Sequence, residues 1–114
     1  MRRRGRRVWR SIFSYTPPQI GVLGALSGLR WLMLRVLGEN EKTTREIHDE
    51  LAIRYGIRIP RTLLYYHLGE LERMGIVEMK GYRETGRGGA PEKVWKLKIR
   101  RIIIDIPSGI IHME

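Results

Sequence analysis

The segment that most restricts the fold of this chain is a leucine-striped stretch between Pro60 and Gly75. Leu64, Leu68 and Leu71 recur at intervals of four and three residues, which places them on one face of an α-helix. Proline suits the first turn of a helix and glycine suits the position just after its end. We therefore expect a helix over residues 60–74, with its leucine face on a hydrophobic core and its opposite face outward.

Two helical regions are predicted before this helix. Residues 17–37 are largely apolar and are interpreted as one helix, or as two helices joined near Ser27, which would be the N-cap of the second. Thr43 and Glu46 have the spacing of a capping box, which marks a helix start. Gly56 suits the C-terminal end of that helix.

Strand signals surround the leucine-striped helix. Residues 57–59 alternate like a short strand, and residues 76–82 and 93–99 are predicted strands on either side of a glycine-rich loop. The order is helix, helix, short strand, helix, strand, basic loop, strand. This order predicts an α+β winged helix-turn-helix, with a three-helix core, a two- or three-stranded wing sheet and an N-terminal helical extension.

The predicted organisation has a single globular domain, since 114 residues can bury one core. Residues 100–106 are rich in isoleucine and predicted to be extended, and Pro107 ends that segment. Such an aliphatic tail must pack on the domain or on a second copy. The expected parts are a disordered basic arm (1–10), a helical extension (11–28), the winged-helix domain (29–99) and an extended tail (100–114).

The net charge of +10 is concentrated in two blocks. Residues 1–10 carry six arginines and no acid, and residues 80–101 carry eight basic and two acidic side chains. Residues 11–79 are neutral, with eight charges of each sign. Two cationic blocks on a neutral body favour a polyanionic partner, because each neutralised phosphate releases counterions.

Several function classes lack the residues they need. The chain has no cysteine, which excludes disulfides and thiolate metal sites and favours a cytoplasmic location. His48, His67 and His112 are isolated, and no cluster has metal-ligand spacing. We find no nucleophile–base pair and no membrane-spanning stretch. We therefore expect a protein that is not an enzyme, uses no cofactor or metal and has no membrane partner.

The outward face of the leucine-striped helix is the first candidate site. Its residues are Arg61, Thr62, Tyr65 and Tyr66. In a DNA major groove, arginine can donate two hydrogen bonds to guanine, threonine can contact a base edge or a thymine methyl, and tyrosine can reach phosphate or base edges. Alternatively, the tyrosines are half-buried aromatics that steady the helix. His67 borders the leucine stripe and is expected to be structural.

Two basic segments form the other candidate sites. In the wing, the candidates are Lys80, Arg83, Arg87 and Lys93. Arg87 lies among glycines, so its guanidinium can enter a narrow minor groove or contact phosphate. In the N-terminal arm, the candidates are Arg2, Arg3, Arg4, Arg6 and Arg7. An arm of this kind orders only on binding.

Residues 64–76, LYYHLGELERMGI, resemble the L-Y-x-x-L-x-x-L-E-x-x-G-hydrophobic signature of PadR-like winged-helix repressors. Residues 88–97, GGAPEKVWKL, are similar to the wing of that family, and ArsR- and MarR-type winged helices share these motifs. The resemblance implies that the four candidates on the helix read DNA and that Arg87 lies at the wing tip. The chain departs from the family at Thr62-Leu63, where Gly-Thr is usual, and in its extended tail, which replaces a dimerising helix.

The sequence therefore predicts a sequence-specific regulator of transcription that binds double-stranded DNA, with a repressor role implied by the resemblance. We expect a homodimer in the cytoplasm, associated with the nucleoid, paired through residues 17–37, the isoleucine tail or both. An effector ligand is not identified. Two alternatives remain open. One is an RNA-binding winged helix of a ribosomal or RNA-processing kind, and the other is a protein-interaction adaptor with the same fold.

Overall fold

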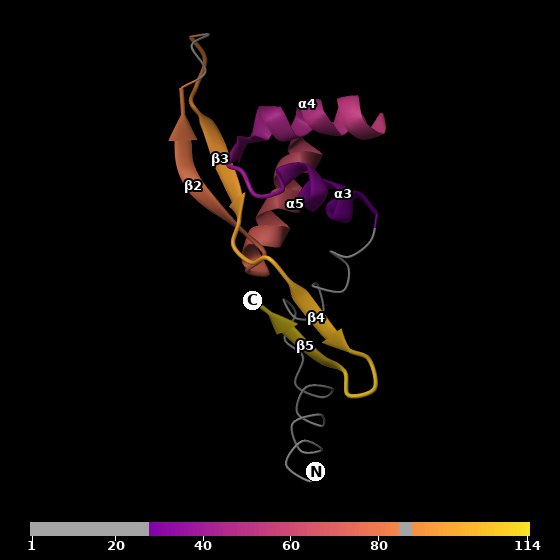
Figure 1. Ribbon diagram of the computed structural model, residues 1–114. Coiled ribbons are helices and arrows are strands. Elements are labelled where there is room, and N and C mark those ends of the chain that lie inside the picture. The colour runs from indigo at the N-terminus through magenta and orange to yellow at the C-terminus, as the bar shows by residue number, and fades with distance from the viewer. Residues whose placement is uncertain (1–27, 85–87) are drawn as a thin grey trace.

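The computed structural model describes residues 28–84 and 88–114. Within them, three helices accompany a three-stranded antiparallel sheet and a two-stranded hairpin (Figure 1). The elements are α3 (Gly28–Leu37), β1 (Lys42–Thr43), α4 (Thr44–Tyr55), α5 (Arg61–Arg73), β2 (Val77–Arg83), β3 (Glu92–Leu97), β4 (Ile102–Asp105) and β5 (Ile110–Met113). Their order is that of an α+β winged helix-turn-helix, which confirms the predicted fold class. The predicted arm (1–10) and residues 11–27 of the predicted extension lie outside the described residues.

The ends of α4 follow the local signals in the sequence. The Thr43 hydroxyl accepts a hydrogen bond from the Glu46 N–H at 3.1 Å, and the Glu46 carboxylate accepts one from the Thr43 N–H at 2.8 Å. This capping box was predicted and is confirmed. Gly56 ends the helix with a φ of +67°, in the left-handed region that favours glycine.

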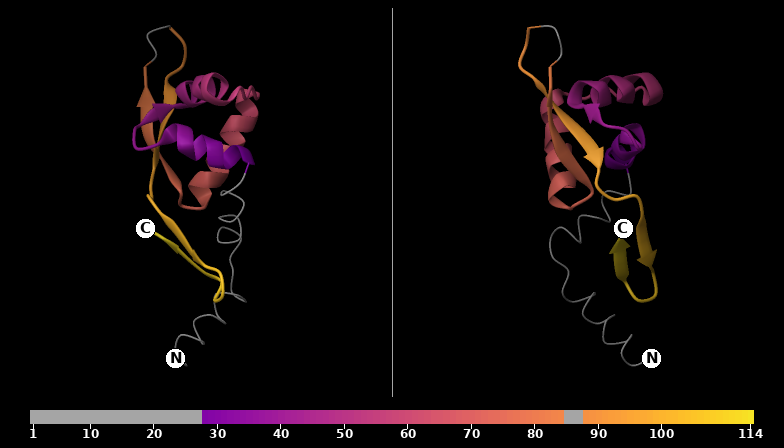
Figure 2. Two further views of the ribbon diagram at one scale, coloured as in Figure 1. Left: turned by 45° about the vertical axis from the view of Figure 1, so that its right-hand side comes forward. Right: turned by 60° about the vertical axis from the view of Figure 1, so that its left-hand side comes forward.

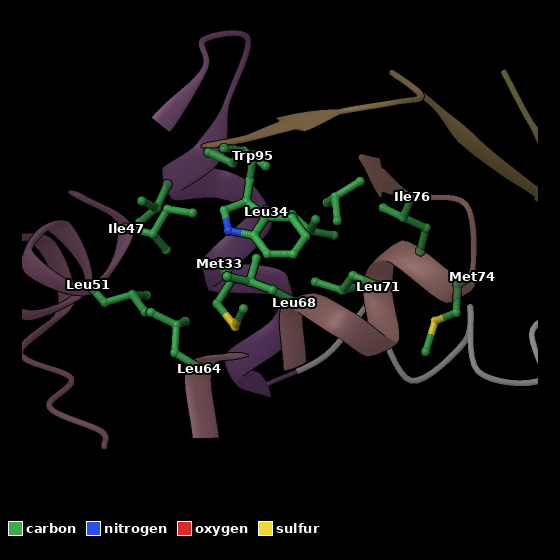
Figure 3. Close-up of a cluster of buried hydrophobic side chains, with 13 residues drawn as sticks. Met33, Leu34, Ile47, Leu51, Leu64, Leu68, Leu71, Met74, Ile76 and Trp95 are labelled. Carbon is green, nitrogen blue, oxygen red and sulfur yellow. The ribbon is translucent and has the colours of Figure 1, made fainter. Parts of the chain in front are cut away.

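The core lies between the three helices and the sheet (Figure 3). The leucine stripe of α5 supplies Leu64, Leu68 and Leu71, each at most 1% exposed, as predicted. From the sheet, Trp95 is 2% exposed, and its indole N–H donates to the Thr44 hydroxyl at 2.9 Å. Because the stripe faces this core, the opposite side of α5 points away from it.

The third strand of the sheet is not the one predicted. Residues 57–59 form no strand; Ile57 and Ile59 instead pack against the core from an irregular segment. The third strand is β1, whose residues Lys42 and Thr43 pair with β3 in the order β1-β3-β2. The alternation of isoleucines therefore reflects partial burial of two side chains rather than strand pairing, so this prediction was wrong.

The C-terminal segment, predicted to be extended, forms a β-hairpin of β4 and β5. Its turn is closed by a hydrogen bond from the Gly109 N–H to the Asp105 carbonyl at 2.8 Å. At its open end, the Glu114 carbonyl accepts from the N–H groups of Arg100 and Arg101 at 2.8 and 2.9 Å. Among the described residues, the hairpin lies at the opposite end from the point where β2 ends and β3 begins (Figures 1 and 2). None of the helices in residues 28–84 and 88–114 could span a lipid bilayer.

Candidate nucleic-acid interface

The outward face of α5 carries the four candidate residues of the helix, and all four are exposed. Tyr66 is 57% exposed and Tyr65 is 37% exposed, whereas Leu64 beside them is fully buried. Thr62 projects from the same outward side in the first turn. The Tyr66 side chain is therefore largely accessible to solvent, and Tyr65 is the less exposed of the two tyrosines.

A lysine of the wing approaches the Tyr65 ring. The ammonium nitrogen of Lys93, on β3, lies 6.0 Å from the centre of the Tyr65 ring, at the outer limit of a cation–π contact. Lys93 pairs across the sheet with Tyr82 on β2, so both side chains project from the same face of the sheet. Tyr82 is 64% exposed. The outward face of α5 and this face of the wing thus form one continuous surface.

Glu92 connects the wing to the first turns of two helices. One carboxylate oxygen accepts from the Arg45 N–H of α4 at 3.1 Å, and the other lies 3.4 Å from the Arg61 guanidinium of α5. The Glu92 side chain is only 13% exposed, whereas that of Arg61 is 44% exposed. The structure therefore places Arg61 against the base of the wing, at the edge of the outward face.

The other wing candidates differ in their surroundings. The Arg83 guanidinium lies 3.2 Å from a Glu46 carboxylate oxygen. Lys80 is exposed and lies at a β-bulge, since Met79 pairs with Trp95 and Gly81 with Val94, the next residue along β3. Arg87, like the arginines of the N-terminal arm, lies outside the described residues.

Sequence reasoning missed two residues of this surface, Tyr82 and Glu92. Tyr82 carried a weak signal, because an aromatic residue beside a basic loop is typical of nucleic-acid-binding surfaces. Glu92 carried none. Its contacts lie 47 and 31 residues away in the chain, so only the tertiary structure reveals them.

His67 lies at the border of the leucine stripe and has a structural contact, in agreement with the expectation. Its Nδ1 accepts a hydrogen bond from the Arg30 Nε at 3.0 Å. Burial lowers the pKa of His67, the Arg30 charge lowers it further, and the Glu70 carboxylate opposes these effects. His67 is therefore held in its neutral form, which the contact with Arg30 requires.

We expect this contact to make stability depend on pH. The folded-state pKa of His67 lies below its ordinary value of 6.5, so the unfolded chain takes up the proton first as pH falls. Its contribution to stability is present above pH 6.5 and is lost as pH falls toward the lowered pKa. The urea midpoint should fall between pH 7.5 and pH 5.5, and His67→Gln, which keeps an acceptor for Arg30, should reduce that fall. An equal fall in both proteins would contradict this assignment.

A metal site without cysteine would need several clustered histidine, aspartate or glutamate side chains. In the described ranges, no cluster of three or more histidine, aspartate or glutamate side chains has a suitable arrangement. Among the charged residues of the surface, Arg61 pairs with Glu92 and Arg83 pairs with Glu46.

Comparison with known proteins assigns this chain to no family. No protein-family model matches the sequence, and no curated protein is similar to it. Among solved structures, the ferric uptake regulator (Fur) of Vibrio cholerae is similar, with 17% sequence identity and a TM-score of 0.38. The match covers 96% of this chain and 74% of that chain. The winged-helix assignment therefore depends on the order and packing of the elements, and membership of the PadR-like family stays a prediction.

Proposed function

We propose that the protein binds double-stranded DNA and regulates transcription, with α5 in the major groove and the wing on the adjacent minor groove or backbone. The observation that carries this proposal is the continuous surface of α5 and the wing, in which Lys93 lies beside Tyr65 and Glu92 beside Arg61. This surface combines basic and aromatic side chains, and both kinds contact nucleic acids.

Each part of the surface has a proposed role. Thr62 and Tyr66, which the fold leaves exposed, would contact base edges, and Lys80, Arg83 and Lys93 would contact phosphates. Arg87 and the arginines of the arm would add minor-groove or phosphate contacts. We propose residues 29–99 as the DNA-binding domain and repression as its effect.

On a matching DNA site, Arg61 would break its ion pair with Glu92 and donate hydrogen bonds to a guanine instead. Its contact with Glu92 is long, and its side chain is 44% exposed, so breaking the pair costs at most about 1 kcal/mol. A bidentate contact with guanine is worth about 1–3 kcal/mol of discrimination between bases. The balance favours release of Arg61 on a matching site and retention of the pair on other sequences.

The test is a competition between nucleic acids at fixed salt, followed by Arg61→Ala. A selected duplex should displace a labelled duplex better than a structured RNA hairpin does. Arg61→Ala should weaken binding to the selected duplex by about 1–3 kcal/mol and relax selectivity at one base position. Glu92→Gln, which keeps an acceptor for the Arg45 N–H, should leave affinity within a few-fold. Fluorescence anisotropy measures the competition and the affinities of both variants.

The outcomes separate the alternatives. Stronger competition by the RNA hairpin would replace this proposal with the RNA-binding one. No binding to either polymer, with the fold intact, would favour the adaptor. An equal loss of affinity for all duplexes on Arg61→Ala would assign Arg61 to the phosphate backbone.

We further propose a homodimer that pairs through the hairpin of β4 and β5. In the described structure, neither strand pairs with a strand other than its hairpin partner, and a two-stranded hairpin is marginally stable alone. Ile102 and Ile111 pack toward the core, whereas Ile103 is 47% and Ile106 is 84% exposed. Burying these exposed isoleucines against a second copy would give a dimer with a twofold axis. The two α5 helices would then be related by the same symmetry as the two halves of an inverted repeat.

Analytical ultracentrifugation at micromolar concentration should therefore show a dimer. Replacing Ile103 and Ile106 by aspartate should give a monomer, because the interface would then bury unpaired charges. Ile53→Asp is the matched control: Ile53 is 81% exposed on α4 and should not affect pairing. A wild-type monomer, or a dimer that survives the double substitution, would remove the hairpin as the interface.

A further inference from the structure

A pocket of about 410 Å³ lies where α3 meets the base of the hairpin. Its walls come from α3, from residues at the ends of the sheet and from the start of β4. The apolar part of its lining consists of Trp31, Leu34, Ile76, Leu97, Ile99 and Ile102. The volume lies in the range of small-molecule sites, which are mostly apolar with a few polar groups.

The charged side chains of the pocket are mainly cationic. Arg35, Arg100 and Arg101 line it together with one acid, Glu39. Arg100 pairs with Glu39, and Arg101 pairs with Glu114, which is not part of the lining. For Arg35, an exposed residue, the described part of the chain offers no ion-pair partner.

We propose that this pocket binds an amphipathic monoanion of small-molecule size. The apolar body of the ligand would contact Trp31 and the isoleucines, and its anionic group would pair with Arg35. Charge complementarity selects this class of ligand: a cation would be repelled by the unpaired charge of Arg35, and a neutral apolar molecule would gain nothing from it. Trp31 is 42% exposed, so its indole offers a flat surface to an aromatic ligand.

This inference goes beyond the proposed function and does not depend on it. The pocket takes none of its lining from the DNA-binding candidates of α5 or the wing. Ligand binding can therefore be measured without DNA, and either proposal can fail while the other holds.

The experiment uses two fluorescent probes with the same ring system. One is 8-anilinonaphthalene-1-sulfonate, an amphipathic monoanion, and the other is N-phenyl-1-naphthylamine, its uncharged counterpart. Both are titrated into the full chain.

Arg35→Gln should lower affinity for the anion about five-fold, the upper end for an exposed ion pair, and should leave affinity for the neutral probe unaffected. Trp31→Ala should weaken both probes. All three substituted residues, including the control Arg58→Gln, are exposed, so the variants should fold.

The expected result is one anion site per chain that responds to Arg35→Gln and Trp31→Ala and not to Arg58→Gln. Absence of anion binding would overturn the proposal. So would anion affinity that is unchanged by Arg35→Gln, or that falls equally with Arg58→Gln, because charge recognition would then not lie in this pocket.

Discussion

Replacing Lys80, Arg83 and Lys93 together by glutamine is expected to weaken duplex DNA binding about a hundred-fold at roughly 0.1 M salt. Each phosphate contact releases about 0.9 counterion, so three lost contacts lower log affinity by up to roughly 2.7 at this salt concentration. We expect a smaller effect because Arg83 must also leave Glu46, to which it is paired. The slope of log affinity against log salt should become shallower by about 2–3, as measured by anisotropy at several salt concentrations.

The matched control removes the same three charges from the other end of the molecule. Arg35, Lys98 and Arg101 are exposed and lie on α3 and near the base of the hairpin. Their replacement by glutamine changes net charge equally and should leave the salt slope unaltered. If both triple variants lost the same affinity, net charge alone would explain binding and the wing would have no contact role.

Trp95→Ala is expected to lower the free energy of unfolding by about 3–5 kcal/mol. The indole is 2% exposed and belongs to the core cluster, and surrounding side chains relax only partially into the space that a deleted core side chain leaves. The loss is a large fraction of the stability of a domain of this size. Urea unfolding followed by circular dichroism measures it without relying on tryptophan fluorescence.

Trp95→Phe separates packing from hydrogen bonding at this position. The smaller ring retains much of the contact but leaves the Thr44 hydroxyl, which is fully buried, without its donor. We expect a loss of about 1–3 kcal/mol, below that of the alanine variant. A loss under about 1 kcal/mol for Trp95→Ala would contradict the central place of this residue in the core.

The parts of the fold that were predicted correctly depend on short-range chemistry. The capping box of Thr43 and Glu46 links two residues three positions apart and determines the start of α4 regardless of the remaining structure. The spacing of Leu64, Leu68 and Leu71 similarly identifies the buried face of α5, because helical geometry alone relates these positions.

The missed features depend on contacts between distant segments. β1 has only two residues, and its strand character comes entirely from pairing with β3. The isoleucines of residues 57–59 show strand-like alternation, but they pair with no strand of the sheet. The hairpin turn has a local signal, because Pro107, Ser108 and Gly109 are residue types common in turns. The register in which β4 pairs with β5 has no local signal and is known only from the structure.

Within the candidate site, the sequence identified the exposed side chains and missed how they are arranged. Exposure of Thr62 and Tyr66 follows from helical geometry. The approach of Lys93 to Tyr65 and the pairing of Arg61 with Glu92 depend on how the sheet packs against α5. Such contacts leave no pattern in the local sequence.

The bridge made by Glu92 has a consequence for how a duplex would be read. One Glu92 carboxylate oxygen accepts from the Arg45 N–H, and this bond remains when Arg61 leaves the other oxygen for a guanine, so the start of β3 stays joined to the packed helices α4 and α5 at a set separation. A duplex seated on α5 and the wing would have to bring its two grooves to that separation, and flexible base steps deform at lower energy than stiff ones. Selectivity would then extend to base pairs that no side chain touches.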